Sequence, residues 1–420
     1  MKRESSYWKR KSIRDPLYGF IGLSERELKI INSEAFLRLN RIKQLSHTYL
    51  VYPSAVHTRY EHALGTMHVA DRICINLDLD DNIREIVRCA ALLHDIGHGP
   101  FSHLFENVLQ KIDRDITHED ISRLIIKNDN EISSALNDIQ DNVIDVLRRK
   151  FKDSIASDII SSGLDADKLD YLRRDSYHLG VAYGIFDLER ILHTITKSNH
   201  NRLCVYEKGK DALENYRLGR YLMHMQVYEH HTRIVADQMF IKALELALDE
   251  GIIDKDVLRS ANNNFLDYYM KLDDYSIYKM VIENKPNSKA AELLKDIQGR
   301  RLLKRACELD PDYDIRDAEK RKEIIDINTN PKRKEEITKE IANKANINDS
   351  DRIIIHLSTI SIKLYGDELL VLRYNNNVEE LSRLSPITAN PKTVTKFYVF
   401  CPKDKREEVK RATYEYFSIK

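Results

Sequence analysis

The sequence predicts a mainly α-helical fold, in which an all-helical core is followed by a small C-terminal α+β lobe. Gly and Pro are scarce, with 13 and 9 residues in a chain of 420, and this favours long helices over a turn-rich β architecture. Apolar residues recur at helical spacing as far as about residue 310, and three short runs rich in β-forming residues follow. We therefore expect a core domain at 1–310 and a lobe at 311–420.

The composition is that of a soluble globular protein, with 42% apolar and 32% charged residues. Lys plus Arg and Asp plus Glu both number 67, so no global positive field is available to hold a nucleic acid. The basic N-terminal segment leads into no apolar stretch, and no window reaches the roughly 18 apolar residues of a membrane-spanning helix. Five dispersed cysteines without a CxxC pair indicate a reducing compartment. We expect a cytoplasmic protein without membrane contact.

Helix signals recur along the first 250 residues of the chain. Ser24 and Glu27 form a capping box that predicts a helix running toward Leu39. Another helix is expected to begin near Arg59, after a loop at 48–56. Further helices are predicted at about 82–96, 118–127, 138–150, 154–162, 166–179 and 209–250, the last as one or two long helices.

The character of the sequence changes after Asp310. Residues 316–347 are charge-dense and have the apolar spacing of exposed helices. β-rich runs then follow at Arg352–His356, Glu368–Tyr374 and Phe397–Phe400, and a helix from about Lys405 closes the chain. This lobe has no cluster of catalytic residue types in its sequence, so we expect it to serve packing or assembly.

The densest chemical signal is the segment HDIGHGPFSH, which runs from His94 to His103. An apolar helix end precedes it, and the glycines and proline within it are expected to terminate that helix. Three histidines and Asp95 therefore lie where a buried helix opens into a loop. Imidazole and carboxylate groups are the ligands expected for Mg, Mn, Fe or Zn, so the segment indicates a metal site.

Two further segments add residues of the same types. His62 begins a helix upstream, and Asp167 lies downstream, on one helical face with Tyr171 and Asp175 by i, i+4, i+8 spacing. The same spacing recurs on a later helix in Arg220, His224 and Tyr228. Each of these residues alone is more often an ordinary core or surface residue. Together, in an all-helical context, they indicate a functional site.

Several motifs occur in the same order as in a known family. They are IRDPLYG from Ile13, RIKQL from Arg41, HTRYEH from His57, the HDIGHGPFSH segment, DADKLDYLRRDSYHLG from Asp165 and RRLLK from Arg300. Together they resemble the dNTP triphosphohydrolases of the HD superfamily, a family with bacterial and mammalian members, over most of the chain before the lobe. We expect no counterpart of the SAM domain of the mammalian members, because the resemblance already begins at Ile13.

The resemblance implies an HD-domain core that hydrolyses a dNTP to a deoxynucleoside and triphosphate. One divalent ion, Mg, Mn, Fe or Zn, would be bound by His62, His94, Asp95 and Asp167. The triphosphate would be bound by Arg59, Lys168, Tyr171 and Arg220. The histidine and carboxylate group beside the scissile phosphorus would comprise His98, His103, His118 and Glu119, with either His103 or His118 as the proton donor.

The resemblance also implies how the sugar is recognised. Gln44 and Asp175 match contacts to the 3′-hydroxyl, while Leu45 and Tyr228 match the residues that crowd the 2′ position, and His224 is counted with the substrate site. Two positions depart from the mammalian pattern. Glu106 replaces an Asp, and Glu229 replaces a Gln and so adds negative charge near the expected base site.

Two other functions stay open on the sequence. An HD phosphodiesterase or nuclease acting on cyclic nucleotides or single strands would share the metal residues, although two-metal versions need extra histidine ligands around the HD pair. A nucleotide-sensing oligomer without turnover would keep only the pocket, and the intact set of acid–base candidates argues against it. Against the phosphodiesterase or nuclease, Lys168 with Arg59 suits a terminal triphosphate better than it suits a cyclic nucleotide or a single strand.

The resemblance further implies regulation by assembly. In that family a second nucleotide site forms between subunits and orders an active tetramer, and Lys11, Arg300 and Lys304 match basic positions of that site. Residues that read guanine in the mammalian members are replaced here by Asn32, Leu37 and Asn40. We therefore expect a homo-oligomer, a tetramer, whose nucleotide activator is not restricted to guanine.

Overall fold

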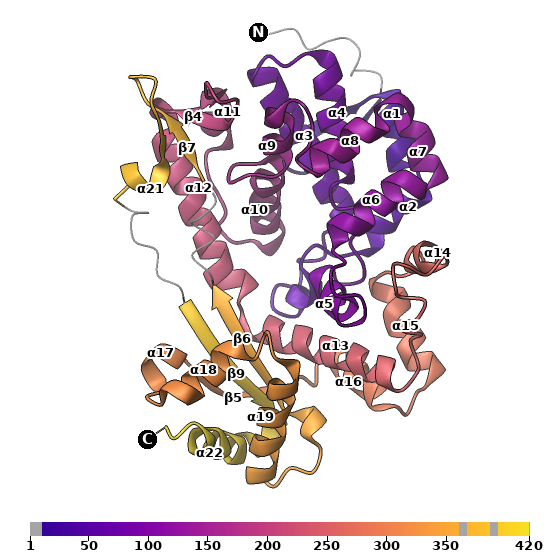
Figure 1. Cartoon of the computed structure of the whole chain (residues 1–420), viewed down its shortest axis with the longest axis vertical. Coiled ribbons are helices and arrows are strands. Elements are labelled where there is room, and N and C mark those ends of the chain that lie inside the picture. Colours follow the sequence, from indigo (N-terminus) through magenta and orange to yellow (C-terminus); the bar gives the residue numbers. More distant parts are fainter. Residues whose placement is uncertain (1–10, 361–367, 387–393, 420) are drawn as a thin grey trace. The chain divides into compact units, whose positions relative to one another are not determined.

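The computed structural model describes residues 11–360, 368–386 and 394–419, which are coloured along the sequence in Figure 1. The chain forms two compact units. Unit 1 comprises Met1–Met223, Asp254–Lys279 and Tyr365–Asn390, and unit 2 comprises His224–Ile253, Met280–Leu364 and Pro391–Lys420. The domain boundary expected near residue 310 stays a prediction.

Unit 1 is mainly helical, as predicted. Its centre is α3 (Arg59–Asn76), which packs against α4 (Asp81–Leu93) and α10 (Ala166–Leu179). Buried apolar residues of α3 and α4, among them Met67 and Leu92, form the core between these helices. Further helices of this unit are α1 (Glu25–Ile31), α2 (Glu34–Leu37), α5 (His103–Ile112), α6 (His118–Asn128), α7 (Asn130–Leu136), α8 (Gln140–Leu147), α9 (Ser154–Ile160), α11 (Leu188–Thr194), α12 (Lys210–Met223), α14 (Phe265–Tyr269) and α21 (Leu381–Leu384).

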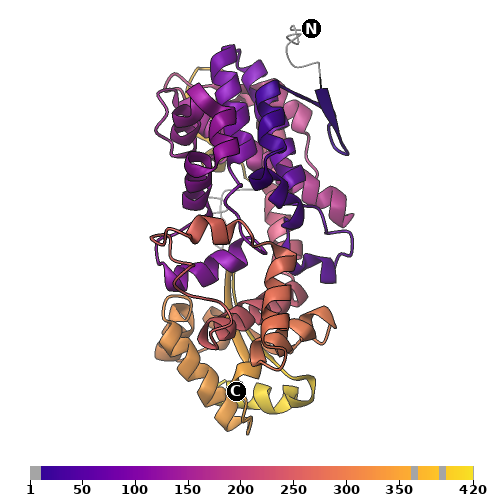
Figure 2. The same ribbon diagram turned by 90° about the vertical axis from the view of Figure 1, so that its right-hand side faces the viewer.

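Two small sheets complete unit 1. The antiparallel hairpin of β1 (Lys11–Asp15) and β2 (Gly19–Leu23) is drawn in indigo in Figure 2. The second sheet has the order β3 (Ile195–Lys197), β4 (Leu203–Tyr206), β7 (Leu370–Leu372) and β8 (Val378–Glu380). Strands β4 and β7 pair in parallel, so a segment from late in the chain returns to unit 1.

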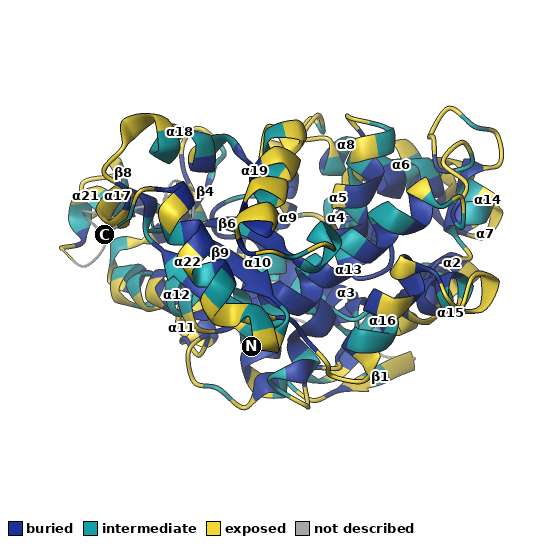
Figure 3. Cartoon of the chain, turned by 90° about the horizontal axis from the view of Figure 1, so that it is seen from below, coloured by how far each residue is buried: buried dark blue, intermediate teal, exposed yellow. Residues whose placement is uncertain are grey.

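Unit 2 contains a three-stranded antiparallel sheet with the order β5 (Lys304–Leu309), β9 (Val394–Cys401) and β6 (Ile354–Ile360). Its helices are α13 (His231–Asp249), α16 (Lys289–Gln298), α17 (Pro311–Asp314), α18 (Ala318–Asp326), α19 (Pro331–Lys344) and α22 (Arg406–Tyr416), and α15 (Asp274–Asn284) begins in unit 1 and ends in unit 2. Buried side chains such as Ile341, Val399 and Val409 form its core. Figure 3 shows buried β6 and β9 and the exposed face of α19 that the charge-dense sequence predicts.

Local capping explains where helix ends differ from the prediction. The helix predicted to run from Ser24 toward Leu39 ends at Ile31, because Ser33 caps the separate helix α2 by accepting a hydrogen bond from the Phe36 N–H. Helix α4 ends at Leu93, three residues before the predicted end. Strands also occur before residue 310, in β1 to β5, where nearly continuous helix was expected. In the described part of the chain, no helix combines the length and apolar character needed to cross a membrane.

Candidate active site

Three helices bring the predicted metal residues together in unit 1. His62 lies in the first turn of α3, His94 follows the last residue of α4, and Asp167 lies in the first turn of α10. Asp167 Oδ1 is 3.0 Å from His62 Nε2 and 3.7 Å from His94 Nε2. Asp95 Oδ1 is 3.3 Å from His94 Nε2. All four side chains therefore face one another.

Hydrogen bonds determine which nitrogen of each imidazole faces this cluster. His94 Nδ1 lies 2.7 Å from the Ala91 carbonyl oxygen, which can only accept, so Nδ1 carries the proton. His62 Nδ1 lies 2.8 Å from Asp170 Oδ2 in the same way. Both Nε2 atoms can then offer lone pairs, and His94 Nε2 is buried without a hydrogen-bond partner among the described residues. Two imidazole lone pairs and two carboxylates fit a divalent metal ion.

A buried chain of ion pairs keeps the His62 ring in this orientation. Arg174 donates to both oxygens of Asp170 at 2.9 Å and to Asp15 at 2.9 Å. Arg174 and Asp170 are fully buried. Gly65 of α3 permits the close approach of α10, because a Cβ at this position would lie 2.0 Å from Asp170 Oδ1.

The electrostatics of this cluster favour bound positive charge. Burial lowers the pKa of His62, but hydrogen bonds with Asp167 and Asp170 outweigh burial and raise the pKa to about 10. Burial likewise raises the pKa of Asp167, yet His62 and His94 hold that pKa well below its usual range. The ionised carboxylates therefore favour a cation at this point, either a proton or a metal ion.

Two cationic side chains predicted to hold phosphate lie next to the cluster in sequence. Arg59 donates to Asp95 and, through Nε, to Ser102 Oγ at 2.7 Å. Lys168 Nζ donates to Asp165 Oδ2 at 2.7 Å. Burial lowers the pKa of Lys168, but the Asp165 carboxylate raises it above its ordinary value, so this lysine is charged at neutral pH.

Tyr171 of α10 follows Asp167 by one helical turn, and its ring centroid lies 6.4 Å from that of His62. Burial raises the pKa of Tyr171 to about 12, against the opposing charges of Arg220 and Lys168. Tyr171 is therefore a neutral hydroxyl close to two cationic side chains, which suits a hydrogen bond to a phosphate oxygen. Arg220 lies on α12 of the same unit.

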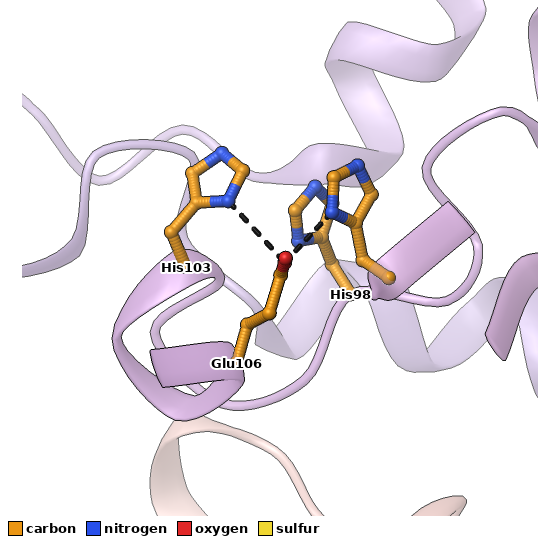
Figure 4. A group of neighbouring side chains, drawn as sticks. His98, His103 and Glu106 are labelled. Atoms are coloured by element: carbon orange, nitrogen blue, oxygen red, sulfur yellow. Dashed lines mark hydrogen bonds and ion pairs between the residues drawn. The ribbon is translucent and has the colours of Figure 1, made fainter. Parts of the chain in front are cut away.

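A second cluster lies beside the first, and Figure 4 shows its His98, His103 and Glu106 side chains. Glu106 Oε2 is 2.7 Å from His118 Nδ1 and 3.4 Å from His103 Nδ1. The His98 ring stacks on the His118 ring with centroids 4.0 Å apart. His98 Nε2 is also 3.4 Å from Asp95 Oδ1, so Asp95 joins the two clusters.

The charge of this second cluster is set by Glu106. Burial raises the pKa of Glu106, but hydrogen bonds from His103 and His118 outweigh burial and lower the pKa to about 2. Burial and the nearby charges of Arg59 and His118 lower the pKa of His98 well below its usual range, so His98 is neutral. An ionised carboxylate thus faces His118, which is the arrangement that orients an acid–base histidine.

Glu119 does not join this cluster. Its side chain is 64% exposed and lies 3.8 Å from Arg123. Glu119 does line a cavity of about 350 Å³ together with His94, His118 and Asp167, among others, and its catalytic role stays a prediction. Glu106, which the sequence places at a position of the family pattern without a role, belongs to this cluster, and its i, i+3 spacing after His103 indicates one of its contacts.

The predicted sugar contacts fall in both units. Gln44 and Leu45 precede α3, and Asp175 lies on the third turn of α10, all in unit 1. His224 and Tyr228 lie in a π-helical turn that begins unit 2, where their rings make an edge contact at 4.9 Å. Helix α12 ends at Met223, so Arg220, His224 and Tyr228 do not lie on one continuous α-helix, as their spacing had led us to expect. The roles of all these residues stay predictions.

The residues expected in a regulatory site also divide between the units. Lys11 is an exposed residue of β1 in unit 1. Arg300 and Lys304 belong to unit 2, where Lys304 begins β5 and lines a cavity of about 220 Å³ with Arg305 and Arg406. Glu229 belongs to unit 2 as well and accepts a hydrogen bond from Ser358.

The chain matches two descriptions of protein families. The HD domain matches residues 59–175, which contain both histidine clusters, and the HD associated region matches residues 186–420, more than half of the chain. HD domains bind divalent metal ions, and His62, His94 and Asp167 offer ligand atoms within 4.8 Å of one another.

Known proteins resemble the chain over most of its length. An uncharacterized protein of Methanocaldococcus jannaschii is 40% identical over 65% of this chain and 59% of that protein. The human deoxynucleoside triphosphate triphosphohydrolase SAMHD1 is 30% identical over 73% of this chain and 56% of that protein. The matched region thus spans about three fifths of these relatives. A solved phosphohydrolase of Bacteroides thetaiotaomicron is 26% identical, with a TM-score of 0.76 over 93% of this chain and 99% of that chain. From the motifs, the two clusters and these similarities together, the chain belongs to the HD-domain phosphohydrolases that carry an HD-associated region.

Proposed function

We propose that the protein is a dNTP triphosphohydrolase, which converts a dNTP and water to a deoxynucleoside and inorganic triphosphate. The observation that carries this proposal is that Asp95 contacts both clusters, through His94 in the first and His98 in the second. The side chains of the first cluster suit a metal ion, and the second contains the His118–Glu106 pair. The similarity to a human enzyme named as a deoxynucleoside triphosphate triphosphohydrolase supports the choice of substrate.

The reaction needs charge neutralised on the phosphoryl oxygens, an oriented water and a proton for the leaving oxygen. Water adds to the α-phosphorus, and the bond between that phosphorus and O5′ breaks. A divalent ion held by His62, His94, Asp95 and Asp167 would polarise a phosphoryl oxygen and lower the pKa of bound water. Arg59, Lys168 and Arg220 supply positive charge for the departing triphosphate.

Within the second cluster we assign proton donation to His118 rather than His103. The His118 side chain is 21% exposed, whereas that of His103 is 65% exposed. Glu106 accepts from Nδ1 of His118, so Nε2 is the atom left to carry a proton to O5′. The ionised Glu106 also holds the His118 ring in this orientation.

A specific observation favours a second candidate function. His98, His103, Glu106 and His118 offer ligand atoms within 4.8 Å of one another, so this cluster could hold a second metal ion. Two metal ions would suit an HD phosphodiesterase or nuclease that cleaves cyclic nucleotides or single strands. In that case His118 would be a ligand and not an acid.

Product analysis separates these functions. The purified protein is incubated with dATP, a cyclic dinucleotide and a single-stranded oligonucleotide, each with Mg²⁺ or Mn²⁺, and the bound metal is counted. The proposal expects deoxyadenosine and triphosphate from dATP, and one ion per chain. Cleavage of the cyclic dinucleotide or the oligonucleotide with two ions per chain would favour the second candidate. Formation of dAMP and diphosphate would contradict the assigned bond cleavage.

The regulatory part of the proposal is a homotetramer activated by a nucleotide. Lys304 lies in a cavity with Arg305 and Arg406, and these three charges could bind phosphate groups of an activator. Residues Asn32, Leu37 and Asn40 are exposed, as a contact to another chain would require. None of the three reproduces the guanine-reading side chain of the mammalian members, so the activator is not restricted to guanine.

A further inference from the structure

One buried histidine, His57, contacts both residues assigned to the 3′-hydroxyl of the sugar. His57 Nε2 lies 2.8 Å from Asp175 Oδ1, and the two side chains are 0% and 1% exposed. The carbonyl oxygen of the same His57 accepts a hydrogen bond of 3.0 Å from the backbone N–H of Gln44. His57 therefore links Gln44, which precedes α3, to Asp175 on α10.

The surroundings of His57 restrict both its backbone and its ring. The segment that contains Lys43 pairs with Thr58 in an isolated antiparallel bridge, and the Arg59 N–H donates to Ile42 O at 3.0 Å. Residues 42–44 and 57–59 are therefore paired along their backbones, and this pairing restricts the backbone of His57 just before α3.

The ring of His57 is held by stacking. It lies on the ring of His178 with centroids 4.4 Å apart and an angle of 13° between the planes. Burial, with a further effect from His57, lowers the pKa of His178 to about 4, so the stacking partner is neutral at neutral pH. The His57 plane, and with it the carboxylate of Asp175, has little freedom to turn.

The side chain of Gln44, whose backbone N–H donates to His57 O, presents an acceptor that the described residues leave unused. Gln44 Oε1 is buried and makes no hydrogen bond within the described part of the chain. A buried acceptor without a donor is unfavourable, and a hydroxyl group of a bound ligand would supply the donor. A hydroxyl group donates one hydrogen bond and accepts others, so it can donate either to Gln44 Oε1 or to the Asp175 carboxyl, and in the second case it can accept from the amide N–H of Gln44.

We propose that His57 is the positioning residue for recognition of the 3′-hydroxyl. It holds the Asp175 carboxylate through its side chain and holds Gln44 through its backbone, and it does not itself touch the sugar. The inference rests on the proposed function, because it takes the substrate to be a nucleotide whose sugar meets Gln44 and Asp175.

The test compares dATP with 2′,3′-dideoxy-ATP, which lacks only the 3′-hydroxyl. The wild type should show a kcat/KM for dATP at least about tenfold above that for the dideoxy substrate. His57→Ala should lower kcat/KM for dATP by about tenfold and leave the dideoxy value within about twofold, so the preference disappears. His57→Gln places an amide donor near the position of Nε2 and should restore part of the preference. In an Asp175→Ala background, His57→Ala should cause no further loss of preference.

Controls separate positioning from a general structural role. His68→Phe removes another imidazole from the same part of unit 1 and should leave the substrate ratio unchanged. If His57 has only a structural role, His57→Ala should lower kcat/KM equally for both substrates, and the metal content and the thermal midpoint should fall as well. That result would overturn the inference. If a variant has no measurable turnover, the dissociation constants of dATP and 2′,3′-dideoxy-ATP are compared instead.

The two proposals fail in different ways. A wild-type preference for dATP that His57→Ala retains would overturn the positioning role alone. A wild type that neither hydrolyses dATP nor distinguishes the two nucleotides in binding would overturn the proposed function, and the positioning role with it.

Discussion

Glu106 Oε2 lies 2.7 Å from His118 Nδ1, and the pKa of Glu106 falls to about 2, so an ionised carboxylate faces this ring throughout the neutral range. His118 Nδ1 donates to this carboxylate, so Nε2 is the ring nitrogen left to meet a reactant. This arrangement suits a histidine that gives up a proton during the reaction. The relationship therefore makes the acid–base role of His118 testable through its partner.

Replacing Glu106 should expose that role. His118→Ala should lower kcat by about 10²-fold or more, the usual contribution of a general acid. Glu106→Gln keeps an acceptor for Nδ1 but removes the charge, so the alkaline limb of the pH–rate profile should move to lower pH, with metal content unchanged. Loss of metal in either variant would instead identify the cluster as a second metal site.

The metal cluster predicts a different outcome for Asp167. Asp167→Ala removes the carboxylate that lies 3.0 Å from His62 Nε2 and 3.7 Å from His94 Nε2, so bound metal and activity should fall together to near background. The helical circular dichroism should stay largely intact, because Asp167 lies in the first turn of α10 and its side chain is 30% exposed. Asp211→Ala, at a side chain that is 91% exposed, is the matched control. Full metal content in Asp167→Ala would contradict the ligand assignment.

Stability should depend on pH through His68, which lies outside both clusters. Burial, followed by the charge of Arg72, lowers the pKa of His68 from 6.5 to about 4. Because the folded pKa is depressed, this contribution to stability is fully present above about pH 6.5 and is lost as the pH falls toward 4. Between pH 7.5 and 5.0 the loss should be about 2 kcal/mol.

The measurement is urea unfolding of the wild type and of His68→Phe at both pH values. Phenylalanine retains an aromatic ring against Tyr18, whose centroid lies 4.8 Å from that of His68. The variant should therefore lose less stability on acidification than the wild type. Equal losses in the two proteins would show that His68 does not contribute.

The sequence predicted those parts of the fold and site that depend on local patterns. Capping at Ser24 and helical periodicity each act within a few residues, and the predicted helices follow from them. The HDIGHGPFSH motif likewise indicates a metal site at His94 and Asp95, whereas His62 and Asp167 were added to it through the family resemblance. Long-range pairing carries no such local signal. The parallel pairing of β4 with β7 depends on residues far apart in the chain, and so does the contact between His57 and Asp175.

The missed role of Asp170 has a similar cause. In the sequence it belongs to the charged face of a helix, and only the packing of α3 against α10 reveals that it orients His62. Glu106 differs, because its spacing from His103 was visible in the sequence and only its contact with His118 needed the structure.

Sugar specificity gives another prediction. If Leu45 lies beside C2′, as the resemblance implies, a ribose hydroxyl would be buried against its apolar side chain without a partner, at a cost of about 1–3 kcal/mol. At about 1.4 kcal/mol for each factor of ten, dATP should be preferred over ATP by roughly tenfold or more in kcat/KM. Leu45→Asn would offer the hydroxyl a partner and should narrow the ratio. Equal turnover of ATP and dATP by the wild type would contradict the assignment.

The remaining prediction concerns assembly. A nucleotide can shift an oligomeric equilibrium only by binding one state more tightly than the other, so activity and tetramer should rise at the same nucleotide concentration. Light scattering and activity are measured together while GTP, dGTP and dATP are varied separately. The exposed Leu37 and Asn40 cannot supply the guanine contacts of the mammalian members, so more than one base should activate.

Lys304→Ala tests whether the cavity in unit 2 binds the activator. It should raise the nucleotide concentration needed for assembly by about tenfold, because a charge-assisted contact to phosphate is lost. The maximal rate at saturating activator should stay unchanged, because Lys304 takes no part in the chemistry. Lys339→Ala, at an exposed lysine of α19 in the same unit, is the control and should leave assembly as it is. A monomer that is fully active without any added nucleotide would overturn the regulatory proposal, and a strict requirement for GTP would overturn the interpretation of Asn32, Leu37 and Asn40.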